Sequence, residues 1–155
     1  MGESRRPHRL NLTDKARPAA GFSLMEVMIV LTVMSVLIAM AAPSFQRALE
    51  QSRADVAGAN LRALWSAERL YWLENHAYTS DLNQLQLLGL LDPTVVTAST
   101  VYVYAVTTAD DNSFTATATR VGSTVWSGNY IVDQTGATIG TIEADGKPSI
   151  LPGYQ

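Results

Sequence analysis

The chain has 155 residues, with 11 Lys and Arg, 14 Asp and Glu, and no cysteine. This length suits one ordinary domain with an appendage, and the missing cysteine excludes disulfides, thiolate metal sites and lipid attachment at cysteine. Residues 1–21 have a formal charge of +3 and the remainder has −6, and an acidic remainder argues against the phosphate contacts on which nucleic-acid binding depends.

An apolar run follows this basic segment, over residues 22–42. No charge occurs in 27–42, where only Thr32 and Ser35 are polar, and Glu26 is the one charged residue in the whole run. A membrane-spanning helix needs roughly 20 apolar residues, and a basic flank before it keeps the N-terminus in the cytoplasm. We therefore predict that 22–42 crosses a membrane in this orientation.

Two general explanations of the run leave Glu26 without a special role. A secretory signal could be cut at the small residues Ala39-Met40-Ala41, but the apolar run exceeds the usual 7–15 residues and Pro43 would hinder that cut. In a plain membrane anchor, Ser23 and Glu26 have the S-x-x-E spacing of a capping box that satisfies free amides of the first helical turn. The helix dipole also favours a carboxylate there.

A third explanation accounts for all of these features. The sequence G-F-S-L-M-E, the apolar run after it and Pro43 resemble the N-terminal signature of type IV pilins and type II secretion pseudopilins. The resemblance implies that a prepilin peptidase cuts between Gly21 and Phe22, removes residues 1–21 as a leader and N-methylates Phe22. This leader is longer than is usual in the family when phenylalanine follows the cut.

The same resemblance implies a role for Glu26 in assembly. Its carboxylate would neutralise the charged N-terminus at Phe22 of a neighbouring subunit in a homo-polymer. An unpaired charge in apolar surroundings is penalised by several kcal/mol, so the pairing would check the register of each added subunit. The implied partners are other subunits, prepilin peptidase and an inner-membrane assembly platform. The subunit would wait as a single-pass inner-membrane protein before entering an extracellular pilus or a periplasmic pseudopilus.

Beyond Pro43 the helix is expected to resume, giving one long helix over 22–76. Pro43 removes a backbone hydrogen bond and Gly58 costs about 1 kcal/mol of helix stability, so both are predicted points of bending. Apolar residues at helical spacing form a thin stripe that broadens after Ala59, which predicts a protruding stalk followed by a segment packed on a sheet. The stripe consists of Phe45, Leu49, Val56, Ala59, Ala63, Ala67 and Leu70, and the residues that broaden it are Leu61, Leu64, Trp65, Tyr71, Trp72 and Leu73. We expect His76 to lie at the end of the helix, where a cation favours the dipole.

Residues 77–155 are predicted to form a C-terminal α+β head. A loop and short helix come first, and the later segments are rich in Val, Ile, Thr and Tyr with period-two alternation. We predict three or four antiparallel strands in a meander, with Gly136 in a turn. The fold class is thus α+β, with the long helix packed on a small antiparallel sheet.

The sequence contains no nucleophile elbow, no glycine-rich phosphate loop and no paired histidines. We therefore predict no catalytic residues and no cofactor. Calcium needs six to eight oxygen ligands. Its possible ligands, Asp110, Asp111, Asp133 and Asp145, are scattered without EF-hand spacing, so polar turns are favoured over a metal site.

The predicted function is that of a structural subunit of a type IV pilus-like filament. The first alternative is a pseudopilin of type II secretion, which shares the N-terminal signature. The pilin is favoured because the chain lacks the aspartate-proline-tryptophan-glycine segment of many secretion pseudopilins. The second alternative is a membrane-anchored enzyme or binding domain, which would require a convergent polar pocket in 77–155.

Overall fold

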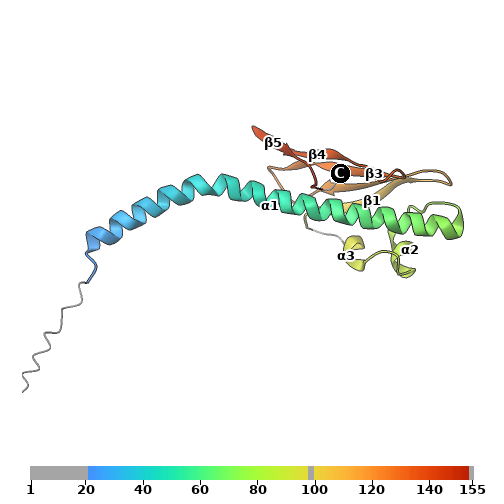
Figure 1. Ribbon diagram of the computed structural model, residues 1–155, viewed down its shortest axis with the longest axis horizontal. Coiled ribbons are helices and arrows are strands. Elements are labelled where there is room, and N and C mark those ends of the chain that lie inside the picture. Colours follow the sequence, from blue (N-terminus) through green and yellow to red (C-terminus); the bar gives the residue numbers. More distant parts are fainter. Residues whose placement is uncertain (1–20, 98–99, 154–155) are drawn as a thin grey trace, which may run out of the picture. The chain divides into compact units, whose positions relative to one another are not determined.

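A computed structural model describes residues 21–97 and 100–153 of the chain (Figure 1). The predicted leader, residues 1–21, lies outside the described residues except for Gly21. The chain divides into two compact units, Met1–Met40 and Ala41–Gln155. One helix, α1 (Leu24–Asn75), contributes to both units. The second unit therefore contains the later part of this helix together with residues 77–155.

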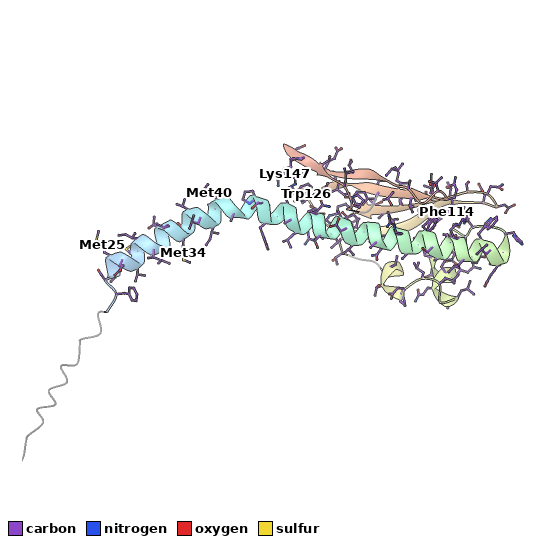
Figure 2. All side chains as sticks on the ribbon, in the orientation of Figure 1. Met25, Met34, Met40, Phe114, Trp126 and Lys147 are labelled. Carbon is purple, nitrogen blue, oxygen red and sulfur yellow. The ribbon has the colours of Figure 1, made fainter. Side chains whose placement is uncertain are left out.

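In the first unit, α1 is apolar on all sides. Its large apolar side chains are exposed throughout, including Met25, Met34 and Met40 (Figure 2). Thr32 Oγ1 donates to the carbonyl of Met28 at 2.7 Å, and Ser35 Oγ donates to the carbonyl of Thr32 at 2.8 Å. The Thr32 and Ser35 hydroxyl groups are therefore satisfied within the helix, as an apolar environment requires. Among the described residues, α1 alone is long and apolar enough to cross a membrane.

The second unit packs α1 on an antiparallel sheet, which confirms the predicted α+β class. The sheet is a meander in the order β1-β2-β3-β4-β5. After α1, the elements are α2 (Leu82–Leu87), α3 (Pro93–Val96), β1 (Tyr102–Ala109), β2 (Phe114–Arg120), β3 (Ser127–Asp133), β4 (Thr138–Ala144) and β5 (Lys147–Ile150).

The predicted strand count of three or four was wrong, because the sheet has five strands. The strand β5 has only four residues and contains Pro148, so its composition is that of a loop. A proline is tolerated there because β5 lies at the edge of the sheet, where one side of the strand needs no hydrogen-bonding partner. Gly136, with φ 85°, lies in the turn between β3 and β4 as predicted.

Alternating residues of the sheet form the core against α1. In β2, Phe114, Ala116 and Ala118 are fully buried, and the threonines between them lie on the opposite face. Leu61 and Leu64 of α1 are fully buried against this inner face. The result is a two-layer arrangement of one helix on one sheet. Leu85 of α2, Val95 of α3 and Leu91 between these helices belong to the same core.

The buried face of α1 differs from the apolar stripe that the sequence predicted. Of the seven stripe residues, only Ala67 is buried, and the other six are exposed. The packed segment begins at Glu50, well before Ala59. The sequence prediction failed here because the close contacts are made by small residues, Ala54, Ala57 and Gly58, which carry little hydrophobic signal but let the helix approach the head closely.

The helix α1 continues through Pro43 and Gly58 and ends at Asn75, one residue before the predicted end. His76 has φ 55° and donates its backbone N–H to the carbonyl of Trp72 at 2.8 Å. A left-handed residue directly after the last helical residue is a common way to terminate a helix. His76 thus lies at the helix terminus, as the sequence suggested.

Residues 151–153, which directly follow the last strand of the sheet, bind along α1. Gln51 Nε2 donates to the carbonyl of Leu151 at 2.6 Å, and the Gly153 N–H donates to Asp55 Oδ1 at 2.7 Å. Between these bonds, Pro152 is buried against Gly58. We call residues 151–153 the tail strap. It holds the head to the helix in a chain that has no cysteine for a disulfide.

We expect Gly58→Ala to destabilise the protein even though alanine favours helix. The new Cβ would lie 2.8 Å from Cβ of Pro152, closer than van der Waals contact allows. Overpacking of this kind typically costs about 1–3 kcal/mol, which exceeds the roughly 1 kcal/mol gained in helix propensity. Thermal unfolding of the detergent-solubilised chain measures the effect. In a Pro152→Gly background the same substitution should stabilise, and stabilisation in the wild-type background would contradict the steric argument.

Candidate functional site

The predicted cleavage bond lies in an open stretch just before α1. Gly21 and Phe22 are both exposed, and Phe22 has 83% of its surface accessible. A side chain at Gly21 would meet no atom within 4 Å. The backbone on both sides of this bond is therefore accessible to an enzyme, and glycine permits the close approach that a protease active site needs.

Glu26 lies in the first turn of α1, next to the predicted new terminus. It lines a small hollow of 250 Å³ together with Phe22, Val27, Val30 and Leu31. The Ser23 carbonyl accepts a hydrogen bond from the Val27 N–H at 3.2 Å, which starts the helix. Between Gly21 and Gly153, no described cation forms an ion pair with Glu26. The carboxylate is thus exposed on an apolar surface, at the end of the helix whose dipole favours negative charge.

A buried ion pair in the head was missed by the sequence prediction. Arg120, at the end of β2, donates through Nε to Glu50 Oε1 at 2.5 Å and through Nη2 to Glu50 Oε2 at 3.0 Å. The side chains of Glu50 and Arg120 are only 1% and 4% exposed. Arg53, which is 47% exposed, adds a contact of 3.1 Å to Glu50. This pair joins α1 to the sheet.

Arg120 is also bound by the backbone and by an aromatic ring. Its Nη1 donates to the carbonyl of Val101 at 3.1 Å and to that of Val121, and its guanidinium lies 5.7 Å from the centre of the Tyr102 ring. Burial alone raises the pKa of Glu50, but its hydrogen bonds and ion pairs with Arg120 and Arg53 outweigh this effect and hold the pKa below the ordinary value. Glu50 is therefore a buried, charged carboxylate.

A second glutamate of α1, Glu68, is fully buried and forms no ion pair with any cation that the structure describes. Its Oε2 accepts a hydrogen bond from the Thr79 N–H at 3.1 Å, while Oε1 has no hydrogen-bonding partner. Burial raises the pKa of Glu68 to about 7, and the Thr79 hydrogen bond opposes this shift. The sequence did contain a signal for both acids, because Glu50 and Glu68 recur in helical phase with the buried residues Leu61 and Leu64.

The acidic turns use their carboxylates to form the turns themselves. Asp110 accepts from the N–H groups of Asn112 and Ser113, at 2.8 and 2.7 Å, and Asp133 accepts from the Thr135 N–H at 2.8 Å. These bonds lower the pKa of both aspartates. In the described part of the chain, no three His, Cys, Asp or Glu side chains are grouped as metal ligands.

A cavity of 370 Å³ lies between α1 and β1. It is lined by Ser52, Arg53, Val56, Asn60, Thr94, Val101, Tyr102 and Tyr104. Asn60 Nδ2 donates to the Tyr104 hydroxyl at 2.9 Å. The lining contains neither a histidine nor a carboxylate, so it offers no acid–base pair of the kind that hydrolytic catalysis requires.

Comparison with known proteins matches both parts of the chain. Residues 16–42 match the family described as "Prokaryotic N-terminal methylation motif". Residues 43–128 match the family described as "Type IV minor pilin ComP, DNA uptake sequence receptor". The second match covers more than half of the chain and includes most of the head.

Three characterised proteins are similar to the chain. The type IV wide pilus major component PilA4 of Thermus thermophilus is 32% identical over 111 residues, which cover 71% of this chain and 80% of PilA4. The type II secretion system core protein G of Pseudomonas aeruginosa is 32% identical over 72 residues, or 46% of this chain and 51% of that protein. The type IV major pilin PilA of Myxococcus xanthus is 34% identical over 65 residues, or 42% of this chain and 30% of PilA.

These matches agree with the features already described. The methylation motif covers the exposed Gly21–Phe22 bond, Glu26 and the apolar part of α1. The similarity to PilA4 spans 111 residues and therefore extends into residues 77–155. The characterised relatives are structural subunits of pili and of a secretion system. The chain therefore belongs to the type IV pilin family.

Proposed function

We propose that the chain is a subunit of a type IV pilus filament, and that prepilin peptidase matures it by cutting between Gly21 and Phe22. The observation that carries this proposal is the methylation motif over 16–42 together with an apolar helix that is exposed on all sides. A helix of this kind is stable in a bilayer or surrounded by similar helices, and not in water. Polymerisation provides the second of these environments.

Glu26 is the proposed assembly residue. Once the leader is removed, Phe22 carries a positively charged amino group only four residues from Glu26. In a filament, the Glu26 carboxylate pairs with the amino group of a neighbouring copy, since burying either charge alone would cost several kcal/mol. A subunit that is out of register leaves both charges unpaired. Ser23 remains the predicted cap of the same helical turn, and Pro43 and Gly58 remain the predicted points of bending.

Before assembly, the subunit spans the inner membrane through residues 22–42, with the basic leader in the cytoplasm. The peptidase acts on the cytoplasmic side, and an inner-membrane assembly platform then transfers the mature subunit into the filament. The head is a structural element and not an enzyme. It requires no cofactor, and we propose that its turns bind no calcium, because the Asp110 and Asp133 carboxylates already accept hydrogen bonds from backbone N–H groups.

A pilus is favoured over a secretion pseudopilus by the extent of similarity. The alignment with PilA4 covers 80% of that pilin, whereas the alignment with core protein G covers 51% of that pseudopilin. The pseudopilus remains the alternative, with a periplasmic location. Both assemblies would use Glu26 and Phe22 in the same way.

DNA binding is a second function to consider, because the family matched at 43–128 is described as a DNA uptake sequence receptor. The charges of the head do not favour it. The matched residues 43–128 carry eight acidic side chains and five basic ones, and the basic Arg120 is buried with Glu50. Affinity for DNA depends chiefly on cations that contact phosphates, so we propose that the head binds no nucleic acid.

The test is a Glu26→Ala variant expressed in the native cells. We expect Glu26→Ala to insert in the membrane and to be processed, but to give no filaments, because the N-terminal charge has lost its partner. Electron microscopy counts the filaments, and intact mass spectrometry of wild-type protein should find a chain that begins at a methylated Phe22.

Glu74→Ala is the matched control, because Glu74 is an exposed glutamate on the same helix. It should form filaments at the wild-type level. A mature chain that begins at Ala42 would identify an ordinary secreted protein. Normal filaments from Glu26→Ala would refute the pairing of Glu26 with Phe22.

A further inference from the structure

Charge is distributed unevenly over the described surface of the head. The exposed cations lie mainly on α1, and the acidic side chains lie mainly elsewhere. On α1 the exposed cations are Arg47, Arg53, Arg62 and Arg69, and off α1 the acidic residues are Asp81, Asp92, Asp110, Asp111, Asp133, Glu143 and Asp145. Arg53 is bound to Glu50. After Met40, the acidic residues of α1 are the buried Glu50 and Glu68, the half-buried Asp55, which accepts from Gln51 and Gly153, and the exposed Glu74. Arg62 and Arg69 thus form a basic helix face that the acidic surface of a second copy can attract.

The basic face includes a hollow. Ala59, Arg62, Ala63 and Ser66 line a depression of 310 Å³ on the exposed side of α1. Arg69 lies one heptad after Arg62, on the same face, and its guanidinium is held 5.8 Å from the centre of the Trp65 ring. The small residues leave room for another chain to approach, and the arginines provide charge at the border.

The acidic surface also includes a hollow, at the turn between β4 and β5. A cavity of 400 Å³ is lined by Thr124, Val125, Ser127, Glu143, Ala144, Asp145 and Gly146. Both carboxylate residues are exposed. Lys147 is nearby, but its ammonium lies 5.2 Å from the centre of the Trp126 ring and forms no ion pair with a described carboxylate.

The two hollows lie at different levels along α1. A smaller cavity is lined by Gln46 and Leu49 of α1 together with Val125 and Trp126. Val125 also lines the acidic hollow, which therefore lies near Gln46 and Leu49 along α1. In agreement, Trp126 and Lys147 lie at one end of the sheet and Phe114 at the other (Figure 2). Arg69 is 20 residues after Leu49, which corresponds to roughly 30 Å along a helix.

We propose that the basic hollow of one copy receives the acidic hollow of a second copy, with Arg62 and Arg69 opposite Glu143 and Asp145. This inference rests on the proposed function and specifies a contact within the filament. Because the two surfaces differ and lie apart along α1, the contact is heterologous. In a dimer held by a heterologous contact, each copy still has one unoccupied surface. Further copies can therefore add, and the contact extends into an open polymer.

The test uses the absence of cysteine from the chain. Ala63→Cys and Thr124→Cys, combined in one full-length chain, place one thiol in each hollow without changing a charge. We expect mild oxidation of filaments to give a ladder of disulfide-linked trimers and larger species, because each copy carries both halves of the contact. Each single variant should give no ladder. The pair Ala63→Cys and Asn112→Cys is the matched control, since Asn112 lies at the other acidic end of the sheet, between Asp111 and Phe114.

Charge reversal provides the second measurement. Arg62→Glu with Arg69→Glu should lower filament number about tenfold, since like charges would then face each other across the contact. Glu143→Arg with Asp145→Arg should have the same effect, and combining all four substitutions should restore filaments. Asp110→Arg with Asp111→Arg, combined with the two arginine reversals, should not restore them.

The outcomes separate this contact from the proposed function. Wild-type filaments that form while the double-cysteine filaments give no ladder overturn the contact alone, as does a ladder of equal strength from the Asn112 control. If wild-type cells form no filaments at all, the proposed function fails and the contact fails with it. If the arginine reversals remove bound DNA but leave filament number unchanged, the basic face serves a polyanion and the proposal is overturned.

Discussion

Arg120→Ala is expected to destabilise the protein by about 3–5 kcal/mol, because it leaves the Glu50 carboxylate buried without its main counter-charge. Glu50 would keep only Arg53, whose side chain is 47% exposed. A loss of this size is a large fraction of the stability of a small domain. Urea unfolding of the detergent-solubilised full chain, followed by tryptophan fluorescence, measures it.

Two comparisons make this result specific to the buried pair. Arg53→Ala removes the exposed partner of the same carboxylate and should cost less than about 1 kcal/mol. The double variant Glu50→Leu with Arg120→Met replaces the pair by apolar side chains and should be less destabilised than Arg120→Ala. Equal losses for Arg53→Ala and Arg120→Ala would refute the view that Arg120 carries the interaction.

Glu68 is expected to make the head less stable as the pH rises. Its pKa is raised from 4.5 to about 7 in the folded protein, so the native state binds a proton that the unfolded chain has already released. The stabilisation is complete below pH 4.5 and is lost as the pH rises to about 7. At 1.36 kcal/mol for each pH unit, this loss amounts to about 3 kcal/mol.

Glu68→Gln should remove most of this pH dependence while keeping an acceptor for the Thr79 N–H. The quantity to compare is the change in unfolding free energy between pH 4.5 and pH 8, because any packing penalty of the amide cancels in that difference. Glu74→Gln, at an exposed position of the same helix, should keep the wild-type profile. If the Glu68→Gln profile matches the wild type, Glu68 titrates normally in the folded protein. The pH dependence that Glu50 contributes has the opposite sign. Its pKa is lowered in the folded protein, so its stabilisation is lost only as the pH falls.

The N-terminal half of the chain was more predictable than the head. An apolar run, a basic flank and Glu26 are properties of adjacent residues, so the segment over 22–42 and its signature could be read directly from the sequence. The α+β class and the meander also followed from local periodicity. The fifth strand did not, because Lys147–Ile150 is short and contains Pro148, and only pairing with β4 makes it a strand.

The helical phase of Glu50 indicated a buried position, but its pairing with Arg120 could not be predicted, because this contact joins residues far apart in the chain. Glu50 and Arg120 are 70 positions apart, and no local pattern links them. Arg53, three residues after Glu50 on the same helix, is a nearer potential partner in the sequence. The helix face was misjudged for a related reason, since exposed Val56 and Leu70 look like core residues, whereas Ala57 and Gly58 do not.

The tail strap has a consequence for the order of folding. Its hydrogen bonds join Gln51 to Leu151 and Asp55 to Gly153, across 100 and 98 positions. The helix needs only local contacts and can form within microseconds, whereas contacts between such distant residues form slowly because a long loop must be closed first. During synthesis, α1 can therefore form while the head is still open. The tail strap can close the head only after residue 153 has left the ribosome.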